Sequence, residues 1–230
     1  MGTSTLATGA GVNSRLGKYK ILVVDDHPIV RQGLTRLISQ EDDIEVCGGA
    51  DSVSTAMEQV KATSPDLVVV DISLKDSHGI ELITQVKAFS DRIKILVWSM
   101  FDEKVFAERA LRAGAMGYVN KQEPIETVVA AIRRILRGDM HLSAKMTNSV
   151  LGRLAGGRAV QEDPIATLSN REVEVFHMIG QGMTTQQIAR KLGVSPKTVE
   201  THREKVKFKL NLKNAAELNC RAVQWVLENG

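Results

Sequence analysis

The sequence predicts an α/β doubly wound domain followed by an all-α domain of four helices that contains a helix-turn-helix. Apolar strands alternate with amphipathic helices from Lys20 to about Gly138, whereas residues 165–230 show only helical patterns. The charge changes at the same place. Residues 19–140 hold 15 Lys/Arg and 19 Asp/Glu, and residues 165–230 hold 10 and 6. An acidic first domain and a basic second one indicate that only the second meets nucleic acid.

Five βα units account for the first domain. We expect strands at residues 20–24, 44–49, 66–70, 93–98 and 116–119, and helices at 28–40, 52–63, 79–89, 103–113 and 124–137. Pro28 and Pro124 suit the first turn of a helix, and Gly114 is placed to end one. Parallel neighbours require helical crossovers, so the alternation predicts a parallel sheet, with strand order 2-1-3-4-5.

The remaining segments are less regular. Residues 1–18 are small, polar and aperiodic, which predicts a disordered N-terminal segment before a domain at 19–138. Residues 139–164 are expected to form a mobile linker with a short helix at 143–154, and residues 165–230 the second domain. No apolar run approaches the length of a membrane span, so we expect no membrane partner and a cytoplasmic location.

Carboxylates follow two central strands of the predicted sheet. Asp25 and Asp26 end the first strand, and Asp71 ends the third, after the apolar run Leu67–Val70. The predicted strand order makes these strands neighbours, so the three side chains meet at one edge. They cannot all stay ionised cheaply without a cation. The cluster therefore predicts a Mg²⁺ site built from oxygen ligands.

Two further polar residues follow strands on the same edge, Ser99 after the fourth and Lys121 after the fifth. A hydroxyl and an ammonium would give a phosphoryl group a hydrogen-bond donor and a counter-charge. With the three carboxylates, and in this order, they resemble the receiver domain of bacterial response regulators, which has a flavodoxin-like fold. The resemblance covers about residues 19–140.

The receiver resemblance implies that Asp71 accepts a phosphoryl group from a phosphohistidine on a sensor histidine kinase. Asp26 and Asp71 would bind Mg²⁺ directly, together with the backbone carbonyl of Ser73, and Asp25 would act largely through water.

It also implies that Lys121 pairs with the phosphoryl oxygens, that Ser99 moves to hydrogen-bond them, and that Tyr118 swings inward with that movement. Ser73 and Phe101 would flank the phosphoryl group and control the approach of water. A phenyl ring at Phe101 that only packs on the following helix is an equal alternative.

The second domain begins with a capping box, Ser169 with Glu172, that opens a helix to about Gly180. A second helix is expected at 185–192, and Ser195-Pro196 opens a third after a tight turn. Two short helices joined by a glycine-containing turn predict a helix-turn-helix. The outward face of the third helix should carry Lys197, Thr201, Glu204, Lys205 and Phe208.

The segments L-S-N-R-E-V-E-V-F, Q-G-M-T-T-Q-Q-I-A-R-K-L-G-V-S and K-T-V-E-T-H-R resemble the LuxR-type (NarL/FixJ) DNA-binding domain, from about Thr167 to Asn219. His202 belongs to the motif but points toward the core, so we interpret it as structural. DNA contacts are expected from Lys197, Thr198, Glu200, Thr201, Glu204, Lys205 and Lys209.

The chain departs from that family in two places. Glu200 and Glu204 stand where several members have lysine or a neutral base reader, although a carboxylate can accept a hydrogen bond from cytosine N4. Lys207-Phe208 inverts the usual apolar-then-basic order and leaves Phe208 exposed.

We therefore expect a response regulator and transcription factor, not an enzyme beyond self-dephosphorylation, that dimerises on two-fold DNA sites when phosphorylated. One alternative is a DNA-binding protein whose receiver is vestigial and which acts without phosphorylation. The intact acidic cluster argues against this alternative. Another is a haloacid dehalogenase-type enzyme, but Asp71-Ile72-Ser73 lacks the second carboxylate of the D-x-D motif that those enzymes favour.

Overall fold

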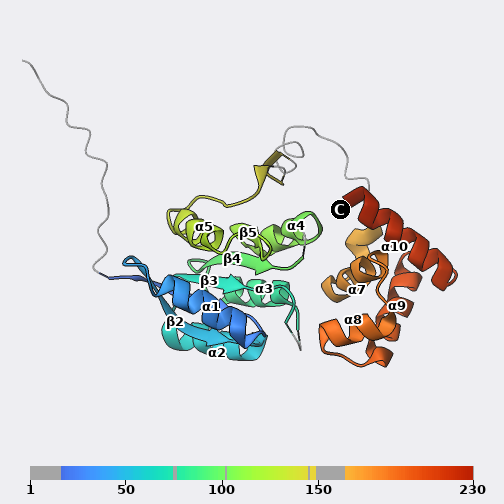
Figure 1. Ribbon diagram of the computed structural model, residues 1–230, viewed down its shortest axis with the longest axis horizontal. Coiled ribbons are helices and arrows are strands. Elements are labelled where there is room, and N and C mark those ends of the chain that lie inside the picture. Colours follow the sequence, from blue (N-terminus) through green and yellow to red (C-terminus); the bar gives the residue numbers. More distant parts are fainter. Residues whose placement is uncertain (1–16, 75–76, 102, 145, 149–163, 230) are drawn as a thin grey trace, which may run out of the picture.

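The computed structural model describes residues 17–74, 77–101, 103–144, 146–148 and 164–229, which form an α/β part and a helical part (Figure 1). Apart from Gly17 and Lys18, the N-terminal segment predicted to be disordered lies outside the described residues. So does most of the predicted linker helix, of which only Ala144 and residues 146–148 are seen to be helical.

The α/β part is one parallel sheet with the strand order β2-β1-β3-β4-β5, which confirms the predicted order. Its strands are β1 (Tyr19–Val24), β2 (Ile44–Ala50), β3 (Leu67–Val70), β4 (Lys94–Ser99) and β5 (Gly117–Asn120). Its helices are α1 (Pro28–Ile38), α2 (Val53–Thr63), α3 (Gly79–Phe89), α4 (Glu103–Ala113) and α5 (Glu126–Leu136).

Each strand contributes to two cores, because successive side chains point to opposite faces. Leu22 and Val24 pack with α2, α3 and α4, whereas Ile21 and Val23 pack with α1 and α5. All four residues of β3 are buried, as a central parallel strand requires. Asp71 follows the last residue of this strand, and its backbone N–H donates to the carbonyl of Val24 at 2.8 Å. The sheet thus fixes the backbone of Asp71 at its carboxyl edge.

Prolines and glycines mark several helix boundaries. Pro28 opens α1, and Gly114, with φ of 109°, follows the end of α4. The helix α5 begins at Glu126, two residues after Pro124. The carbonyl of Pro124 accepts an i→i+3 hydrogen bond from Thr127 at 2.9 Å, so this proline lies in the tighter turn that leads into the helix.

The helical part contains the short 3₁₀ helix η1 (Pro164–Thr167), α7 (Asn170–Gly180), α8 (Thr185–Leu192), α9 (Pro196–Lys209) and α10 (Ala215–Asn229). The capping box predicted at Ser169 and Glu172 is present at the start of α7. Gly193 ends α8 in a left-handed conformation with φ of 64°, and Ser195 caps α9. The unit α8–turn–α9 is the predicted helix-turn-helix.

The segment after α5 packs on the sheet. His141 forms a parallel bridge with Gly117 of β5, and the N–H of Ser143 donates to Glu103 Oε1 at 3.0 Å. This part of the predicted linker is therefore attached to the α/β part. Across the ranges that the structure describes, no helix combines the length and the apolar character needed to cross a membrane.

We predict opposite stability effects for two glycine substitutions in this sheet domain. A Cβ on Gly79, the first residue of α3, would lie 2.1 Å from the backbone oxygen of Asp71, whereas a Cβ on Gly33 in α1 meets nothing within 4 Å. Gly79→Ala should lower the free energy of unfolding by about 2 kcal/mol or more, because rigid backbone must shift. Gly33→Ala should raise it by about 0.5–1 kcal/mol. Urea titration measures both, and equal stabilities for the two variants would contradict the close approach.

Candidate functional site

The carboxyl edge of the sheet gathers an acidic cluster. Metal-binding atoms of Asp25, Asp26, His27 and Asp71 all lie within 4.8 Å of one another, so this group could hold a metal ion. Asp25 and Asp71 are almost fully buried, whereas the ring of His27 is exposed and lies 2.7 Å from Asp26. Two adjacent strand ends, β1 and β3, therefore deliver the three predicted carboxylates to one point.

Lys121 is the cation that compensates this cluster. Its Nζ lies 2.5 Å from Asp25 Oδ2 and 2.5 Å from Asp71 Oδ2, and its side chain is buried. Burial raises the pKa of Asp71, and the charge of Asp25 adds to that rise while Lys121 opposes it. Burial alone would lower the pKa of Lys121, but the carboxylates of Asp71 and Asp25 outweigh it and raise that pKa. Lys121 is thus held charged between two acids.

Ser99 and Tyr118 connect this edge to the loop after β4. Ser99 is fully buried, and its Oγ accepts a hydrogen bond from the N–H of Phe101 at 3.4 Å. Tyr118 already points inward, with its hydroxyl donating to the carbonyl of Phe101 at 2.9 Å. The side chain of Asn120 donates to the same carbonyl at 3.1 Å. The position of Phe101 therefore depends on Ser99 and β5.

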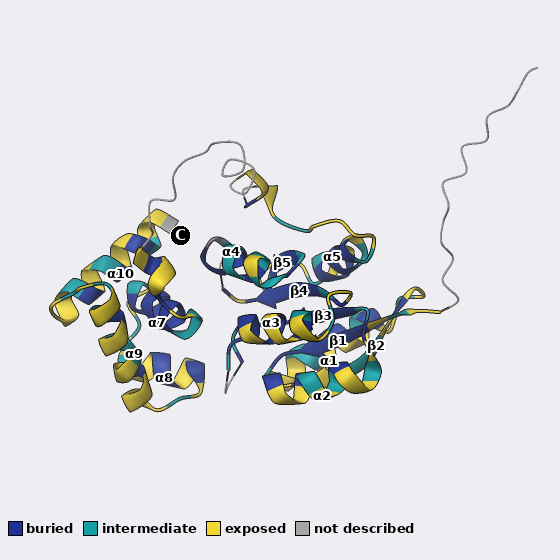
Figure 2. Cartoon of the chain, turned by 180° about the vertical axis from the view of Figure 1, so that it is seen from behind, coloured by how far each residue is buried: buried dark blue, intermediate teal, exposed yellow. Residues whose placement is uncertain are grey.

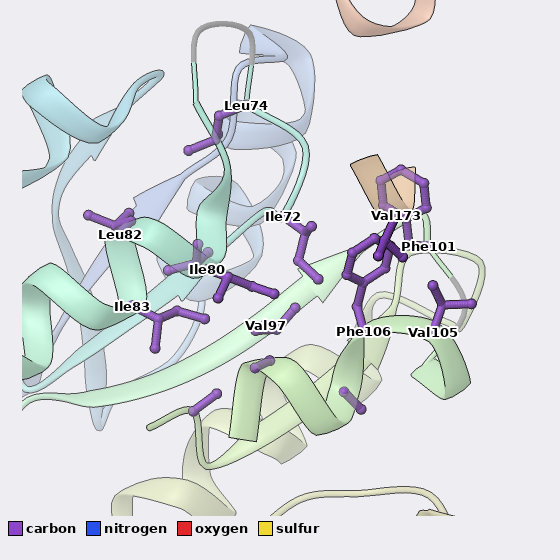
Figure 3. Close-up of a cluster of buried hydrophobic side chains, with 14 of the residues drawn as sticks. Ile72, Leu74, Ile80, Leu82, Ile83, Val97, Phe101, Val105, Phe106 and Val173 are labelled. Carbon is purple, nitrogen blue, oxygen red and sulfur yellow. The ribbon is translucent and has the colours of Figure 1, made fainter. Parts of the chain in front are cut away.

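Phe101 is buried between the two parts of the chain. Its ring lies 4.9 Å from that of Phe106 in α4 and 6.2 Å from that of His177 in α7. Figure 3 shows Val173 of α7 beside both phenyl rings. The packing of Phe101 on the following helix is thus observed, and α7 covers its other side. Shielding of a phosphoryl group by Phe101 stays a prediction.

The helix α7 is buried on all sides, from Glu172 to Ile179, because it packs within the helical part and against the α/β part (Figure 2). Arg109 of α4 supplies the main polar contact. Its guanidinium donates to the carbonyl of Leu168 at 2.9 Å, to the carbonyl of Ile165 at 2.8 Å, and to Asn170 Oδ1 at 3.1 Å. One side chain thereby ties α4 to the segment that begins the helical part.

Glu174 brings a buried carboxylate of α7 close to the acidic edge. Arg171 donates to its Oε2 at 2.7 Å, and its Oε1 faces His78 Nε2 at 3.6 Å. Burial, reinforced by the charge of Asp71 and opposed by Arg171, raises the pKa of Glu174 to about 7. Burial, with the charges of Arg171 and Arg109, lowers the pKa of His78 to about 3, so this imidazole is neutral at pH 7. The interface is therefore electrostatically coupled to Asp71.

The loop between β3 and α3 links Asp71 to His78. The N–H of Ser73 donates to Asp71 Oδ1 at 3.3 Å, and Ser73 pairs with His78 in an isolated antiparallel bridge. His78 Nδ1 accepts the N–H of Ile80 at 3.2 Å, which leaves Nε2 as the protonated nitrogen that faces Glu174. Ser73 and His78 thus connect the carboxylate of Asp71 to Glu174 of α7.

The predicted DNA-contact residues lie along α9, where Lys197, Thr198, Thr201 and Lys205 are exposed. Glu200 accepts a hydrogen bond from Thr185 Oγ1 at 2.6 Å, and Glu204 pairs with Lys207 at 2.8 Å. Lys209 instead pairs with the buried Glu172 at 2.7 Å, so its ammonium also stabilises the helical part. His202 is half-buried and burial lowers its pKa, in keeping with a structural role.

Sequence reasoning missed His27 in the acidic cluster and His78, Arg109 and Glu174 at the interface. The adjacency of His27 to Asp25-Asp26 was a usable signal. The other three meet only because distant segments pack together, and no local pattern marks them. Arg109 and Glu174 each look like ordinary members of a helix.

Two families match the two parts of the chain. Residues 21–133 match the response regulator receiver domain, and residues 166–222 match bacterial regulatory proteins of the luxR family. The "Oxygen regulatory protein NreC" of Staphylococcus carnosus strain TM300 is 36% identical over 205 residues, covering 86% of this chain and 94% of that protein.

Solved structures give the same result. A LuxR-family two-component response regulator from Aurantimonas sp. SI85-9A1 is 33% identical with a TM-score of 0.55, covering 60% of this chain and 99% of that one. RcsB of Salmonella typhimurium is 22% identical with a TM-score of 0.60 and covers 91% of this chain and 98% of its own, which shows the shared fold.

The fold and site thus define a two-domain response regulator, with a receiver domain and a helix-turn-helix DNA-binding domain. The chain belongs to the LuxR family of two-component response regulators, which are DNA-binding transcription regulators.

We predict that Arg109→Ala separates the two domains. The change removes three hydrogen bonds across the interface and leaves the carbonyls of Leu168 and Ile165 without this donor. Small-angle X-ray scattering should show a larger radius of gyration. Arg112→Ala is the matched control, because Arg112 is exposed on the same helix and pairs within it, with Glu108. An unchanged radius for Arg109→Ala would show that the contact does not hold the domains together.

Proposed function

We propose that Asp71 accepts a phosphoryl group from a sensor histidine kinase and that this transfer controls DNA binding by α9. One observation carries the proposal: the loops that surround Asp71 are the loops on which the DNA-binding domain packs. Ser73 and His78 follow Asp71, and Phe101 follows Ser99. Chemistry at Asp71 would therefore alter the surface that α7 covers.

The donor set at this edge fits Mg²⁺. Lys121 pairs with Asp25 and Asp71, and Asp26 adds a third carboxylate beside them. Carboxylate and carbonyl oxygens are the hard ligands that this ion prefers. Asp25, Asp26, Asp71 and the carbonyl of Ser73 would hold it. Mg²⁺, when bound, supplies positive charge that offsets the charge of a phosphoryl group.

The protein's own residues would handle the rest of the transfer. The Asp71 carboxylate oxygen attacks phosphorus, the bond from phosphorus to the histidine nitrogen breaks, and the freed nitrogen keeps the electron pair. Lys121 would remain beside the phosphoryl oxygens as a counter-charge, and Ser99 would donate its hydroxyl to them. The protein is then a phosphoryl acceptor that at most hydrolyses its own phospho-Asp71.

Phosphorylation would weaken the interface in two ways. It adds negative charge at Asp71, whose field already acts on the buried Glu174. It also draws Ser99 toward the phosphoryl group, and with it the loop that carries Phe101 away from α7. Release of α7 would free the DNA-binding domain to pair with a second copy on a two-fold site.

The basic helix α9 would enter the major groove of duplex DNA. Its exposed lysines Lys197 and Lys205 suit phosphate and base-edge contacts, and Glu200 suits cytosine N4. Because the DNA of a bacterium lies in the cytoplasm, we place the regulator there.

We predict that Asp71→Asn abolishes phosphorylation and leaves the fold intact, because the amide preserves the shape of the side chain but is a poor nucleophile. Intact-protein mass spectrometry after treatment with acetyl phosphate and Mg²⁺ should show one phosphoryl group on the wild-type protein and none on the variant. The control is Asp91→Asn, because the Asp91 side chain is 97% exposed. Full acid-labile phosphorylation of Asp71→Asn would reject the assignment.

A second prediction concerns the DNA surface. If Lys197 and Lys205 each neutralise a phosphate, each alanine substitution should make the negative slope of log K against log salt shallower by about one unit. Fluorescence anisotropy over a salt series measures this slope. Lys61→Ala, on the exposed side of α2 in the receiver, should leave it unchanged. Unaltered affinity and slope in both α9 variants would place the DNA surface elsewhere.

A further inference from the structure

Phe208 is the most exposed large apolar side chain in the described part of the chain, with 86% of its surface open to solvent. A single exposed apolar residue needs no explanation by itself, since such residues are common on protein surfaces. Phe208 is of interest because it lies on α9, the helix that we propose to contact DNA. It also occupies the position where the order Lys207-Phe208 departs from the family pattern.

Phe208 lies on the outward stripe of α9. Successive residues of an α-helix are rotated by about 100°, so spacings of four, three and four align Lys197, Thr201, Glu204 and Phe208. Val199 and Val206, both fully buried, occupy the opposite side of the helix. The phenyl ring therefore points in the same direction as the residues proposed to contact DNA.

The surroundings of the ring suit duplex DNA better than an apolar partner. The helix α9 holds five Lys/Arg and two Glu, and Lys205 is exposed one turn before Phe208. Glu204 and Lys207 neutralise each other at 2.8 Å, and Lys209 is held by Glu172. The charges of Glu204, Lys207 and Lys209 are thus paired, and the phenyl ring stands beside one exposed lysine, Lys205, that remains available to a phosphate.

We propose that Phe208 contacts the 5-methyl group of thymine in the major groove and so sets a preference for A·T pairs. A phenyl ring cannot hydrogen-bond to a base edge, and the thymine methyl is the apolar group that the major groove presents. Phe208 lies about 16 Å along the helix axis from Lys197, so the contact falls at the flank of a half-site. The inference rests on the proposed binding of duplex DNA by α9.

The test uses the full-length protein treated with acetyl phosphate and Mg²⁺. A duplex is first selected by this protein from a random-sequence pool, and each thymine is then replaced singly by deoxyuracil, which lacks only the methyl group. At one thymine in each half-site, this replacement should raise the Kd of the wild-type protein about fourfold, which is the change expected when one buried methyl group is lost. Phe208→Ala should bind both duplexes equally.

Two variants serve as controls. Phe208→Leu keeps an apolar side chain and should retain part of the response to deoxyuracil. Leu227→Ala removes a similarly exposed side chain, 79% open, from α10 and should respond as the wild-type protein does. Because Phe208 and Leu227 are exposed, their removal should leave the folded domain stable, which circular dichroism checks.

Several results would overturn the proposal. These are a selected site without thymine, wild-type binding that is indifferent to every replacement, or Phe208→Ala that keeps the fourfold loss. If Phe208→Ala instead lowers the mass seen by sedimentation and leaves the deoxyuracil response intact, the ring belongs to an interface with a second copy. Failure to retain any duplex would overturn the proposed function itself.

Discussion

Much of this structure depends on one buried ammonium, that of Lys121, held between Asp25 and Asp71. Removing three charges from water is expensive, and their mutual attraction repays the cost only if the geometry is well fixed. The sheet supplies that geometry, since β1, β3 and β5 each end at the residue concerned or next to it. The charge of Lys121 offsets only part of the negative charge of the cluster, because Asp26 adds a third carboxylate. A bound cation or a phosphoryl group would therefore change the net charge of this cluster. The backbone there is fixed by the strands and cannot easily move in response.

The balance matters beyond the receiver because the DNA-binding domain packs on the adjoining loops. Aromatic packing of Phe101 against α7, the contacts of Arg109 and the buried Glu174 occupy one continuous surface. The hydrophobic core itself runs across it, from the strands into the helical part. A buried carboxylate at such a surface is costly, so the docked arrangement is sensitive to charge at Asp71. In this docked arrangement the receiver covers α7, which packs against α9, and leaves the outward face of α9 exposed (Figure 2).

Along α9, the polar and apolar side chains that we propose to contact bases are all exposed. Glu200 and Glu204, which depart from the family pattern, are restrained by Thr185 and Lys207. Side chains that are already held in place lose less conformational entropy when they bind DNA. Such carboxylates would discriminate between bases, because they do not attract phosphate. Phe208 adds an apolar group to the same helix. Glu200, Glu204 and Phe208 therefore all lie exposed on the helix that we propose to distinguish one DNA site from another.

The sequence by itself determined the βα alternation, the strand order, the helix-turn-helix and the residues at each strand end. These follow from local periodicity, from capping and turn chemistry, and from the rules for parallel sheets. It also placed Asp25, Asp26, Asp71, Ser99 and Lys121 at one edge, since each follows a strand. Tertiary structure alone decided that Lys209 pairs with Glu172, that Phe101 lies against α7, and that Arg109 and Glu174 join the domains. Those contacts link residues that are as far apart in the chain as His78 and Glu174, on surfaces with no periodicity of their own, so only the packed chain specifies them.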